Sequence, residues 1–465
     1  MATVRTSIHG YWSSRFAFVL AAAGSAVGLG NIWKFPYMAG ENGGGAFVLL
    51  YLICIALFGL PVMMSEVLLG RRGRSSPVNT MTTLAAEEKR SRVWRLLGLM
   101  GVLAGFLILS YYSVIAGWAL AYVLETATGT FSGISGEQAG EVFDNLISNP
   151  RRLLFWHSAF ILLTMVVVIR GVNKGLETAV RILMPALFIL IIIMIGYAML
   201  HGDFLESLKF LFAPDFSKLS PEVVLKAMGQ AFFSLSLGMG AIMMYGSYLP
   251  DDASIATTSF QVAIADTLIA ILAGLAIFPI VLANGLEAGQ GPGLIFNTLP
   301  LAFGQMTGGL IFGTLFFILL VFAAWTSAIS LIEPAVAWLV EKFSISRFIS
   351  SIICGLVAWT VGLGTVYSFN SWKKIDVFDG TILEGKSFFD LLDYLTSNIM
   401  LPLGGILICI FAAWLMSEKS RRDELKIKYE FAYKLWRFLA RYLTPIGVVL
   451  IFLHVLGVLE KLNIT

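Results

Sequence analysis

Charged residues are so sparse in this chain that eleven stretches are long and apolar enough to cross a lipid bilayer. Crossing the hydrocarbon core takes a helix of about 20 mostly apolar residues, and residues 182–200, for example, contain no charged side chain. The eleven predicted spans are residues 16–40, 45–70, 96–125, 153–169, 180–200, 223–248, 256–284, 308–340, 348–368, 390–416 and 440–459. This pattern predicts an all-α polytopic membrane protein.

The composition argues against other classes of protein. Of 465 residues 58% are hydrophobic and 13% charged, against about 25% charged in soluble proteins, so the polar surface is too small for a water-soluble particle. The cysteines number 3 and lie in apolar runs, which argues against a disulfide scaffold. A net charge of +3 over the whole chain forms no basic domain for nucleic acid. The histidines are scattered, without metal-ligand spacing or a nucleophile–base pair, so we predict no enzyme.

The placement of lysine and arginine predicts the orientation in the membrane. Cytoplasmic segments are enriched in these residues, and a cytoplasmic N-terminus with alternating spans puts 22 of the 32 on the cytoplasmic side. The first span continues through Gly24 to Phe35 without a small-residue cleavage site, so we predict that it is not a cleaved signal peptide. We therefore predict a multi-pass protein of the cell (inner) membrane, with its N-terminus in the cytoplasm and its C-terminus outside.

Two of the predicted spans are interrupted by glycines. Residues 24–31 in span one read Gly-Ser-Ala-Val-Gly-Leu-Gly-Asn, and residues 234–240 in span six read Ser-Leu-Ser-Leu-Gly-Met-Gly. Unwound backbone at membrane depth is tolerated only inside protein or around a wet cavity, and paired interruptions in two halves of a chain point to a transporter's binding site. Glycines that only allow close helix packing are the alternative; the polar residues Asn31, Ser234 and Ser236 favour a site.

The motif around the first interruption resembles the signature of the neurotransmitter:sodium symporters. Residues 26–37 read Ala-Val-Gly-Leu-Gly-Asn-Ile-Trp-Lys-Phe-Pro-Tyr, and residues 41–47 read Glu-Asn-Gly-Gly-Gly-Ala-Phe. The resemblance extends from about Trp12 to about Leu415. It recurs at Tyr111-Tyr112, Ser234 to Gly240, Thr298-Leu299-Pro300 and Thr326-Ser327.

This resemblance implies the LeuT-type fold, an inverted repeat of 5+5 transmembrane helices followed by an eleventh. A single transporter domain would then occupy residues 1–465. Repeat one is expected at about 12–200, repeat two at about 220–416, and the extra helix at about 440–459.

The resemblance also implies two sodium sites built from oxygen atoms, for which interrupted helices offer free carbonyls. One site would use the carbonyls of Gly24, Val27 and Ala323 with the hydroxyls of Thr326 and Ser327. The other would use the Ala26 carbonyl, Asn31, Ser234 and Asp266. For Thr326 and Ser327 the alternative is a hydroxyl bonded back to its own helix.

Asp266 is an acid among the apolar residues of span seven. Such a group is costly in a membrane and marks a functional site by default. Chloride-dependent members of the neurotransmitter:sodium symporters have no acid in this neighbourhood. By this resemblance, we expect the Asp266 carboxylate to replace chloride and transport to be chloride-independent. A direct sodium ligand, and an aspartate that faces water at the end of a span, are the alternatives.

The substrate is inferred from polar complementarity. The half-helix that starts near Leu29 offers free N–H groups and a positive dipole end, which suit a carboxylate, and the Tyr112 hydroxyl adds a donor. Carbonyls around Ser234 and the Ser236 hydroxyl suit an ammonium group. Relatives that carry monoamines have an aspartate where Gly28 stands, so the expected substrate is an amino acid.

By resemblance, the side-chain pocket is mostly apolar, which favours a hydrophobic or aromatic L-amino acid over a charged one. The full set of expected substrate-binding residues is Ser25, Ala26, Leu29, Gly30, Ile108, Tyr112, Phe233, Ser234, Ser236, Met239, Ser327 and Leu331.

Two gates are expected from the same resemblance. Outside, Lys34 faces Asp393, with Phe233 as a lid over the substrate; the family usually has arginine at Lys34, and lysine lacks the bidentate fork. Inside, His9 faces Glu341, and Tyr248 lies nearby.

The sequence thus predicts a sodium-coupled amino-acid symporter that works by alternating access. Its expected partners are sodium ions, a neutral amino acid and membrane lipid, and its oligomeric state is open. A proton-coupled carrier with Asp266 as the proton carrier is one alternative. A non-transporting amino-acid receptor or channel is another.

Overall fold

The computed structural model describes residues 5–286, 293–373 and 385–455. Within this part of the chain, nine helical segments are long and apolar enough to cross a membrane, or ten if one bent pair is counted as a span. The nine are Gly45–Gly73, Arg92–Ala127, Pro150–Ile169, Val172–His201, Ile255–Ala283, Gly309–Phe343, Arg347–Ser368, Phe388–Leu415 and Glu430–His454. The remaining predicted span, 223–248, folds as two helices that are each too short to cross, α11 (Pro221–Ser234) and α12 (Ala241–Ser247).

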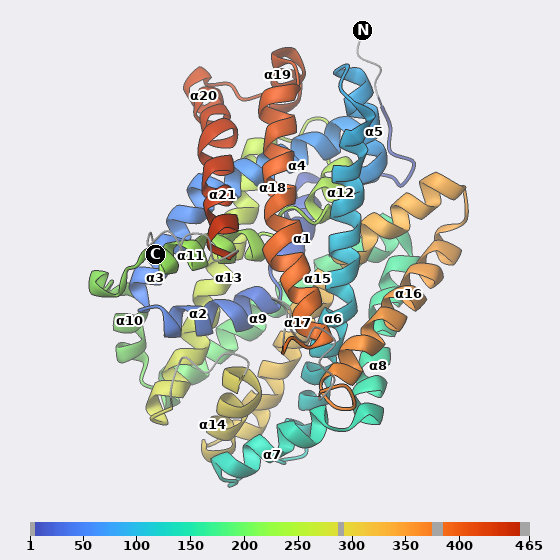
Figure 1. Cartoon of the computed structure of the whole chain (residues 1–465). Helices are drawn as coiled ribbons and strands as arrows, with labels where there is room; N and C mark the ends of the chain where they lie inside the picture. The colour runs from blue at the N-terminus through green and yellow to red at the C-terminus, as the bar shows by residue number, and fades with distance from the viewer. Residues whose placement is uncertain (1–4, 287–292, 374–384, 456–465) are drawn as a thin grey trace.

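Most spans contain one long helix, and short helices connect them. The helices within spans are α1 (Arg15–Ala26), α2 (Phe35–Glu41), α3 (Gly45–Cys54), α4 (Leu60–Gly73), α6 (Arg95–Ala127), α8 (Pro150–Ile169), α9 (Thr178–His201), α13 (Ile255–Ala283), α15 (Gly309–Phe343), α16 (Arg347–Ser368), α17 (Phe388–Asp393), α18 (Leu401–Ile410), α20 (Glu430–Phe438) and α21 (Thr444–Val455). The connecting helices are α5 (Pro77–Glu87), α7 (Gly136–Ile147), α10 (Phe204–Phe212), α14 (Leu299–Gln305) and α19 (Glu418–Leu425). Helices α5 and α19 lie at one end of the molecule, and α7 and α14 lie at the other (Figure 1).

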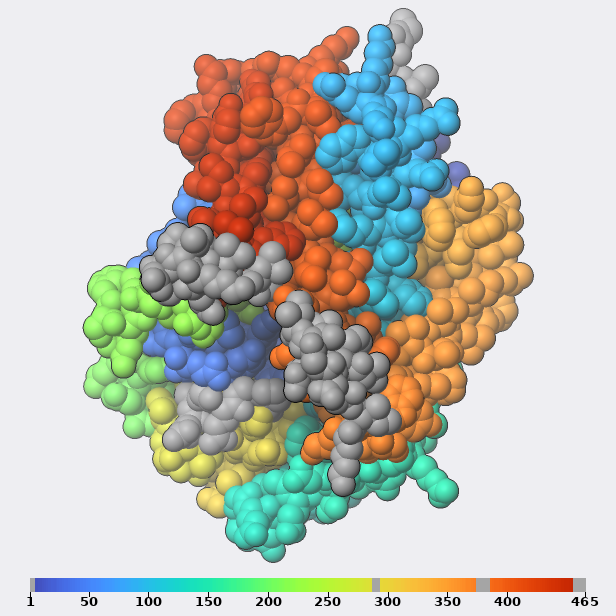
Figure 2. Space-filling model, viewed as in Figure 1, coloured from blue at the N-terminus to red at the C-terminus, as the bar shows by residue number. Residues whose placement is uncertain are grey.

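Burial separates the central helices from the peripheral ones. The most apolar stretch of the α15 segment is 78% buried and that of the α6 segment 72%, and these two helices pack along each other. The corresponding stretch of the α9 segment is only 39% buried. Helix α16 is likewise peripheral and forms an outer edge of the face shown in Figure 2. The exposed apolar sides of such helices suit contact with lipid.

Polar residues fix where several spans begin. Ser14 accepts a hydrogen bond from the Ala17 N–H at the start of α1, and Ser254 accepts one from the Thr257 N–H at the start of α13. Asn149 caps α8 directly before Pro150. Each cap satisfies backbone N–H groups that the first turn of a helix leaves free.

Both interruptions expected from the glycine clusters are present. Helix α1 ends at Ala26, and the chain resumes a helical course from Gly30 at an angle of 54°. Helix α11 ends at Ser234, and Gly238 (φ +80°) and Gly240 (φ +75°) carry the chain to α12 in left-handed conformations that glycine adopts without steric cost. A side chain at Gly238 has no room, since a Cβ there would lie 2.4 Å from the Leu401 carbonyl oxygen.

Glu66, on α4, stabilises the second interruption. Its buried carboxylate accepts hydrogen bonds from the backbone N–H groups of Gly238 (3.2 Å) and Met243 (3.4 Å). Backbone groups freed by unwinding need such partners in a dry interior. We did not predict this role, because in the sequence Glu66 lies near the end of an apolar span, far from the segment that it holds.

Candidate substrate and ion site

A small cavity of about 30 Å³ lies where the two interrupted helices meet. Eleven of the twelve expected substrate-binding residues line it, together with Gly28, and the exception, Ser234, lies beside it. A cavity of about 10–15 Å³ holds one water molecule, so this one has room for about two. The walls therefore have to separate before an amino acid fits. The lining residues are Ser25, Ala26, Gly28, Leu29, Gly30, Ile108, Tyr112, Phe233, Ser236, Met239, Ser327 and Leu331.

At one end of this cavity, the groups expected to bind a carboxylate pair with each other. The Leu29 N–H donates to the Tyr112 hydroxyl oxygen at 3.3 Å. Gly28 is directly beside them: a Cβ there would lie 2.9 Å from the Tyr112 hydroxyl and 2.5 Å from the Ser327 hydroxyl oxygen. A side chain at Gly28 would therefore occupy the space between the expected carboxylate donors.

At the second interruption, Ser236 connects the two broken segments. Its hydroxyl donates to the Ser25 carbonyl at 2.9 Å, and the Ser25 hydroxyl donates to Ser330 at 2.7 Å. Ser236 has φ +54°, a left-handed conformation that is uncommon for a residue with a side chain. The Ser25 carbonyl and the Ser236 hydroxyl thus place oxygen atoms beside the cavity, which suit an ammonium group.

Asp266 lies at the centre of a buried polar cluster beside the cavity. Its carboxylate accepts hydrogen bonds from the Asn31 amide (2.7 Å), the Ser234 hydroxyl (2.7 Å) and the Tyr51 hydroxyl (3.2 Å). The structure therefore brings together three residues of one expected sodium site. Asp266 is fully buried, and within the described residues no lysine, arginine or histidine pairs with it. A buried carboxylate without a cationic partner is suited to hold a cation.

Tyr51 was not predicted as part of this site. It lies within the apolar run of span two, where nothing in the sequence sets it apart from a core aromatic residue.

The residues of the other expected sodium site also gather, on α1 and α15. The Ser327 hydroxyl lies 3.4 Å from the Gly24 carbonyl oxygen and 3.3 Å from that of Val27. Thr326 instead donates to its own helix, at 3.0 Å from the Ala323 carbonyl oxygen, as the alternative interpretation expected. It still faces α1, because a Cβ on Gly24 would lie 3.3 Å from the Thr326 Cβ. An all-oxygen set of this kind suits a hard cation.

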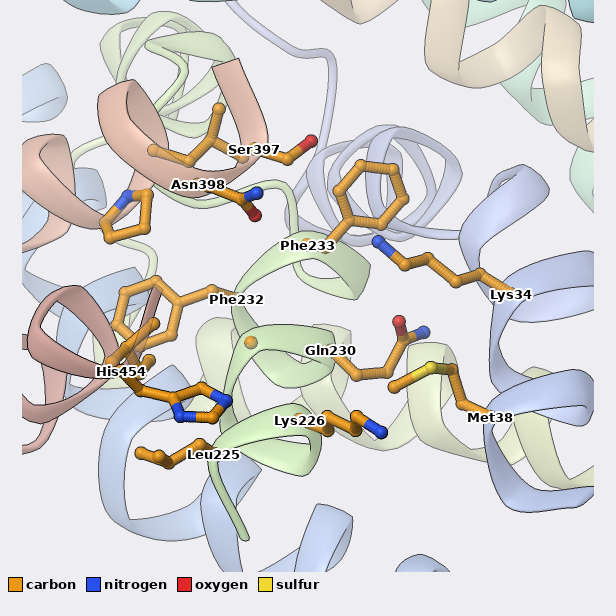
Figure 3. Close-up of a pocket in the computed structure, with 14 residues that line it drawn as sticks. Lys34, Met38, Leu225, Lys226, Gln230, Phe232, Phe233, Ser397, Asn398 and His454 are labelled. Atoms are coloured by element: carbon orange, nitrogen blue, oxygen red, sulfur yellow. The ribbon is translucent and has the colours of Figure 1, made fainter. Parts of the chain in front are cut away.

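At the expected outer gate, the two residues lie apart. Lys34 places its amine 4.4 Å from the centre of the Phe233 ring (Figure 3), a cation–π contact. Asp393 accepts hydrogen bonds from Ser397 (2.8 Å) and Tyr111 (3.3 Å). Within the described residues, Lys34 and Asp393 do not form an ion pair. Both nevertheless line a cavity of about 190 Å³ next to Phe233. The outer gate is therefore not locked by an ion pair here.

On the side of the N-terminus, the expected pair is formed. His9 Nε2 lies 3.0 Å from a Glu341 carboxylate oxygen, and both side chains are almost completely buried. Glu341 also accepts hydrogen bonds from the Ser76 N–H (2.7 Å) and the Asn79 amide (2.6 Å). These contacts link the N-terminal segment to α15 and to the start of α5.

Tyr248 is near His9, at 6.1 Å between ring centres, but it bonds elsewhere. Its hydroxyl donates to Glu333 at 2.7 Å, and Arg347 donates to the same carboxylate at 3.0 Å. We predicted neither Glu333 nor Arg347 as part of the gate. In the sequence Glu333 is a single acid near the end of a long apolar span, and only the fold reveals its partner.

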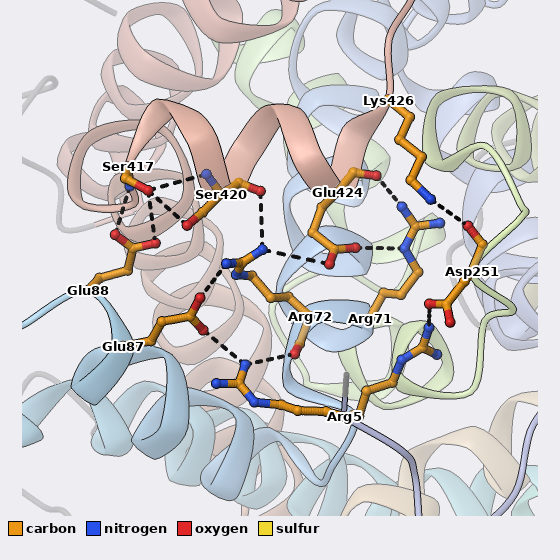
Figure 4. Close-up of polar contacts among 11 residues, drawn as sticks. Arg5, Arg71, Arg72, Glu87, Glu88, Asp251, Ser417, Ser420, Glu424 and Lys426 are labelled. Atoms are coloured by element: carbon orange, nitrogen blue, oxygen red, sulfur yellow. Dashed lines mark hydrogen bonds and ion pairs between the residues drawn. The ribbon is translucent and has the colours of Figure 1, made fainter. Parts of the chain in front are cut away.

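A second layer of polar contacts ties α19 to α4 and α5 at the same end (Figure 4). Arg71 Nε donates to Glu424 at 2.9 Å, and the Ser417 N–H donates to Glu88 at 2.9 Å. Arg5, from the N-terminal segment, donates to Glu87 at 2.9 Å, and Arg72 binds the same carboxylate. Burial raises the pKa of Glu87, but the hydrogen bonds from Arg72 and Arg5 outweigh it and the pKa is lowered.

Two interrupted helices that meet at a cavity inside an apolar bundle are typical of membrane transporters. The sequence profile described as the sodium:neurotransmitter symporter family matches residues 9–137 and 147–464. The chain belongs to this family and is a sodium-dependent transporter, which confirms the resemblance seen in the sequence.

Individual proteins agree with this assignment. The sodium-dependent transporter YhdH of Bacillus subtilis is 39% identical over 97% of this chain and 98% of its own length. A sodium-dependent transporter of Haemophilus influenzae is 33% identical over 95% of this chain and 97% of its own. The crystal structure of MhsT in complex with L-phenylalanine is 43% identical and matches with a TM-score of 0.87, over 96% of this chain and 99% of that chain. The predicted LeuT-type fold is thereby confirmed.

Proposed function

We propose that this protein is a sodium-coupled symporter that takes up a neutral, hydrophobic or aromatic L-amino acid by alternating access. The observation that carries the proposal is the cavity between the two interruptions, which has polar groups for both ends of an amino acid and a mostly apolar wall. The L-phenylalanine bound to MhsT supports the same class of substrate.

In this proposal each end of the substrate has its own partners. The carboxylate enters between the Leu29 N–H and the Tyr112 hydroxyl and replaces the bond that they make with each other. The ammonium group takes the oxygen acceptors of the unwound segments near Ser25 and Ser236. The side chain faces Ile108, Met239 and Leu331. Phe233 closes the cavity from the outer side.

Coupling follows from two sodium ions bound beside the substrate. One is held around Asn31, Ser234 and Asp266 with the Ala26 carbonyl, and the other around Ser327 with Gly24, Val27, Ala323 and Thr326. Each ion moving down 100 mV yields about 2.3 kcal/mol, and a tenfold gradient adds about 1.4 kcal/mol. Two ions with one zwitterion could therefore support an accumulation on the order of 10⁵-fold.

We also propose that transport is independent of chloride. Two sodium ions and a zwitterion bring net positive charge into a dry site, and an uncompensated buried charge is expensive. The Asp266 carboxylate, which already accepts three hydrogen bonds from neutral donors, offsets that charge. The protein would lie in the cell membrane with its N-terminus in the cytoplasm and its C-terminus outside.

The substrate class is tested by competition. Each of the twenty amino acids is added against labelled L-phenylalanine bound to the purified protein, in sodium and in choline. We expect hydrophobic and aromatic L-amino acids to compete best, and binding to require sodium. Preferential competition by charged amino acids would contradict the proposed pocket.

The role of Asp266 is tested by uptake in chloride and in gluconate. We expect equal uptake by the unmodified protein in the two media, and loss of activity in gluconate for Asp266→Asn and Asp266→Ser. Partial rescue of either variant by chloride identifies a charge-compensating role, whereas weakened sodium affinity without rescue identifies a direct ligand. A chloride requirement in the unmodified protein would contradict the proposal.

A further inference from the structure

An apolar groove of about 360 Å³ runs along the outer surface between α8 and α16, far from the substrate site. Its α8 wall extends from Ser158 to Ile169, and its α16 wall from Ile352 to Trp359. Figure 1 shows these two helices side by side. Its volume falls within the range of about 300–1,000 Å³ typical of ligand sites in proteins.

The groove faces the surroundings of the protein. Leu162 is 64% exposed, Val166 52% and Leu356 59%. At the deep end, the two polar lining residues bond to each other: the Trp359 indole N–H donates to the Ser158 hydroxyl at 2.9 Å. The groove therefore offers only apolar contact along its length, which suits a hydrocarbon chain in a bilayer.

Its length corresponds to one leaflet. The α8 wall contains twelve residues, from Ser158 to Ile169, so its ends lie about 17 Å apart at the helical rise of about 1.5 Å per residue. Half of a hydrocarbon core of about 30 Å is close to that value. The groove begins at the end of α8 that lies with the N-terminal segment, where the Asn173 amide donates to the Tyr11 carbonyl at 2.9 Å, and it ends near the middle of α8.

The mouth of the groove carries positive charge. Arg170 follows the last lining residue of α8 and is exposed, and a Cβ on Gly175 would lie 3.0 Å from the Arg170 Cβ, which places the exposed Lys174 close by. Neither side chain forms an ion pair within the described part of the chain. The nearby acids Glu177 and Glu333 are already paired with Arg181 and Arg347. An anionic headgroup would therefore meet two uncompensated basic side chains.

We propose that this α8–α16 groove binds one acyl chain of an anionic phospholipid from the leaflet on the side of the N-terminus, with the phosphate at Arg170 and Lys174. The apolar walls hold the chain, and the basic mouth selects the headgroup. Each basic side chain near an anionic lipid is expected to contribute about a five-fold preference.

Native mass spectrometry of the detergent-solubilised protein tests the proposal, with phosphatidylglycerol and phosphatidylcholine of identical acyl chains added in turn. We expect the unmodified protein to retain one phosphatidylglycerol several-fold more strongly than phosphatidylcholine. Val166→Trp and Leu356→Trp, which fill the groove from opposite walls, should lose that lipid. Ile182→Trp is the matched control, because Ile182 is 64% exposed on α9 and outside the groove.

The headgroup contact is tested separately. Arg170→Gln should reduce the preference for phosphatidylglycerol about five-fold, and Arg151→Gln, at the opposite end of the same helix, should leave it unchanged. Gel filtration and thermal unfolding identify variants that fail to fold. If one of the two tryptophan variants does not fold, the other still tests the groove. Retention of phosphatidylglycerol by both folded tryptophan variants would overturn the proposal. A dimer that Val166→Trp dissociates would also overturn it, since a second copy would then fill the groove.

Discussion

The two ends of the transport pathway differ in how they are closed. At the N-terminal side, His9 and Glu341 are in contact at 3.0 Å, and Glu333 binds both Tyr248 and Arg347. At the opposite side, Lys34 lies over the Phe233 ring, and Asp393 accepts hydrogen bonds from Ser397 and Tyr111. One end is thus held by buried charges with partners, and the other by an aromatic ring with its charges apart.

This difference determines which contacts have to break during a transport cycle. Removing one member of a buried ion pair leaves a charge without compensation, which is strongly destabilising. Charges that line an open cavity are hydrated and contribute little. Opening the N-terminal end therefore requires the rearrangement of several linked contacts, whereas closing the opposite end requires only that Lys34 and Asp393 approach.

The largest effect is expected from breaking the Glu333–Arg347 pair. Glu333 is completely buried, so Glu333→Gln leaves the Arg347 charge without its partner and should cost about 3–5 kcal/mol of stability. Thermal unfolding of the purified protein measures the loss. A double variant, Glu333→Leu with Arg347→Met, should recover most of it. An unchanged unfolding temperature for the single variant would show that the pair does not hold the inner end.

A large effect on binding is expected at Gly28, which belongs to neither gate. A Cβ there would lie 2.5 Å from the Ser327 hydroxyl oxygen, so Gly28→Ala should weaken amino-acid binding by about two orders of magnitude, and Gly28→Asp should abolish it by adding a carboxylate beside that of the substrate. Gly229→Ala is the control, since a Cβ there meets nothing within 4 Å. Equilibrium binding of labelled phenylalanine measures all three. Unchanged affinity in Gly28→Asp would remove Gly28 from the site.

A smaller effect is expected at the outer gate. Lys34→Arg supplies the planar fork that pairs with a carboxylate through two hydrogen bonds, so it should favour contact with Asp393 and slow the release of bound substrate to the outside a few-fold. Lys226→Arg controls for the change of side chain, because Lys226 is paired with Glu222 at 2.7 Å. Dissociation rates after dilution give the comparison. Faster release from Lys34→Arg would contradict a gate formed by these two residues.

The smallest effect is expected at the surface pair of Arg5 and Glu87. The lowered pKa of Glu87 means that its interactions stabilise the fold above the ordinary glutamate pKa, near 4.5, and lose that contribution as the pH falls through the lowered value. Glu87→Gln should therefore cost at most about 1 kcal/mol at pH 7. The cost should diminish below about pH 4. Unfolding temperatures at the two pH values test this, and a pH-independent difference would argue against an electrostatic origin.

The sequence predicted the parts of the site that local pattern determines. Glycines in the middle of apolar spans located both interruptions, and the motif around Gly28 identified the family. Residues whose partners lie far away in the chain were not predicted. Glu66 binds a segment more than 170 positions away, and Tyr51 donates to Asp266, which is 215 positions away. Such contacts depend on which helices become neighbours, and no short pattern in the chain specifies that.

The contacts of the two gates could likewise be predicted only in part. The pairing of His9 with Glu341 followed from the resemblance, but the same reasoning expected Lys34 to face Asp393, and here the lysine lies against Phe233 instead. A flexible lysine side chain has several favourable partners within reach, so the position of its amine depends on the state of the whole gate.

Accumulation of an amino acid against its gradient distinguishes a sodium-coupled symporter from the alternative classes of protein. Labelled L-phenylalanine is presented to proteoliposomes under an inward sodium gradient, with choline in place of sodium as the control and an imposed pH gradient as a separate condition. We expect concentrative uptake only with the sodium gradient, and the same uptake when gluconate replaces chloride. Equal uptake in choline, accumulation that follows the pH gradient instead, or binding without any accumulation would contradict this expectation.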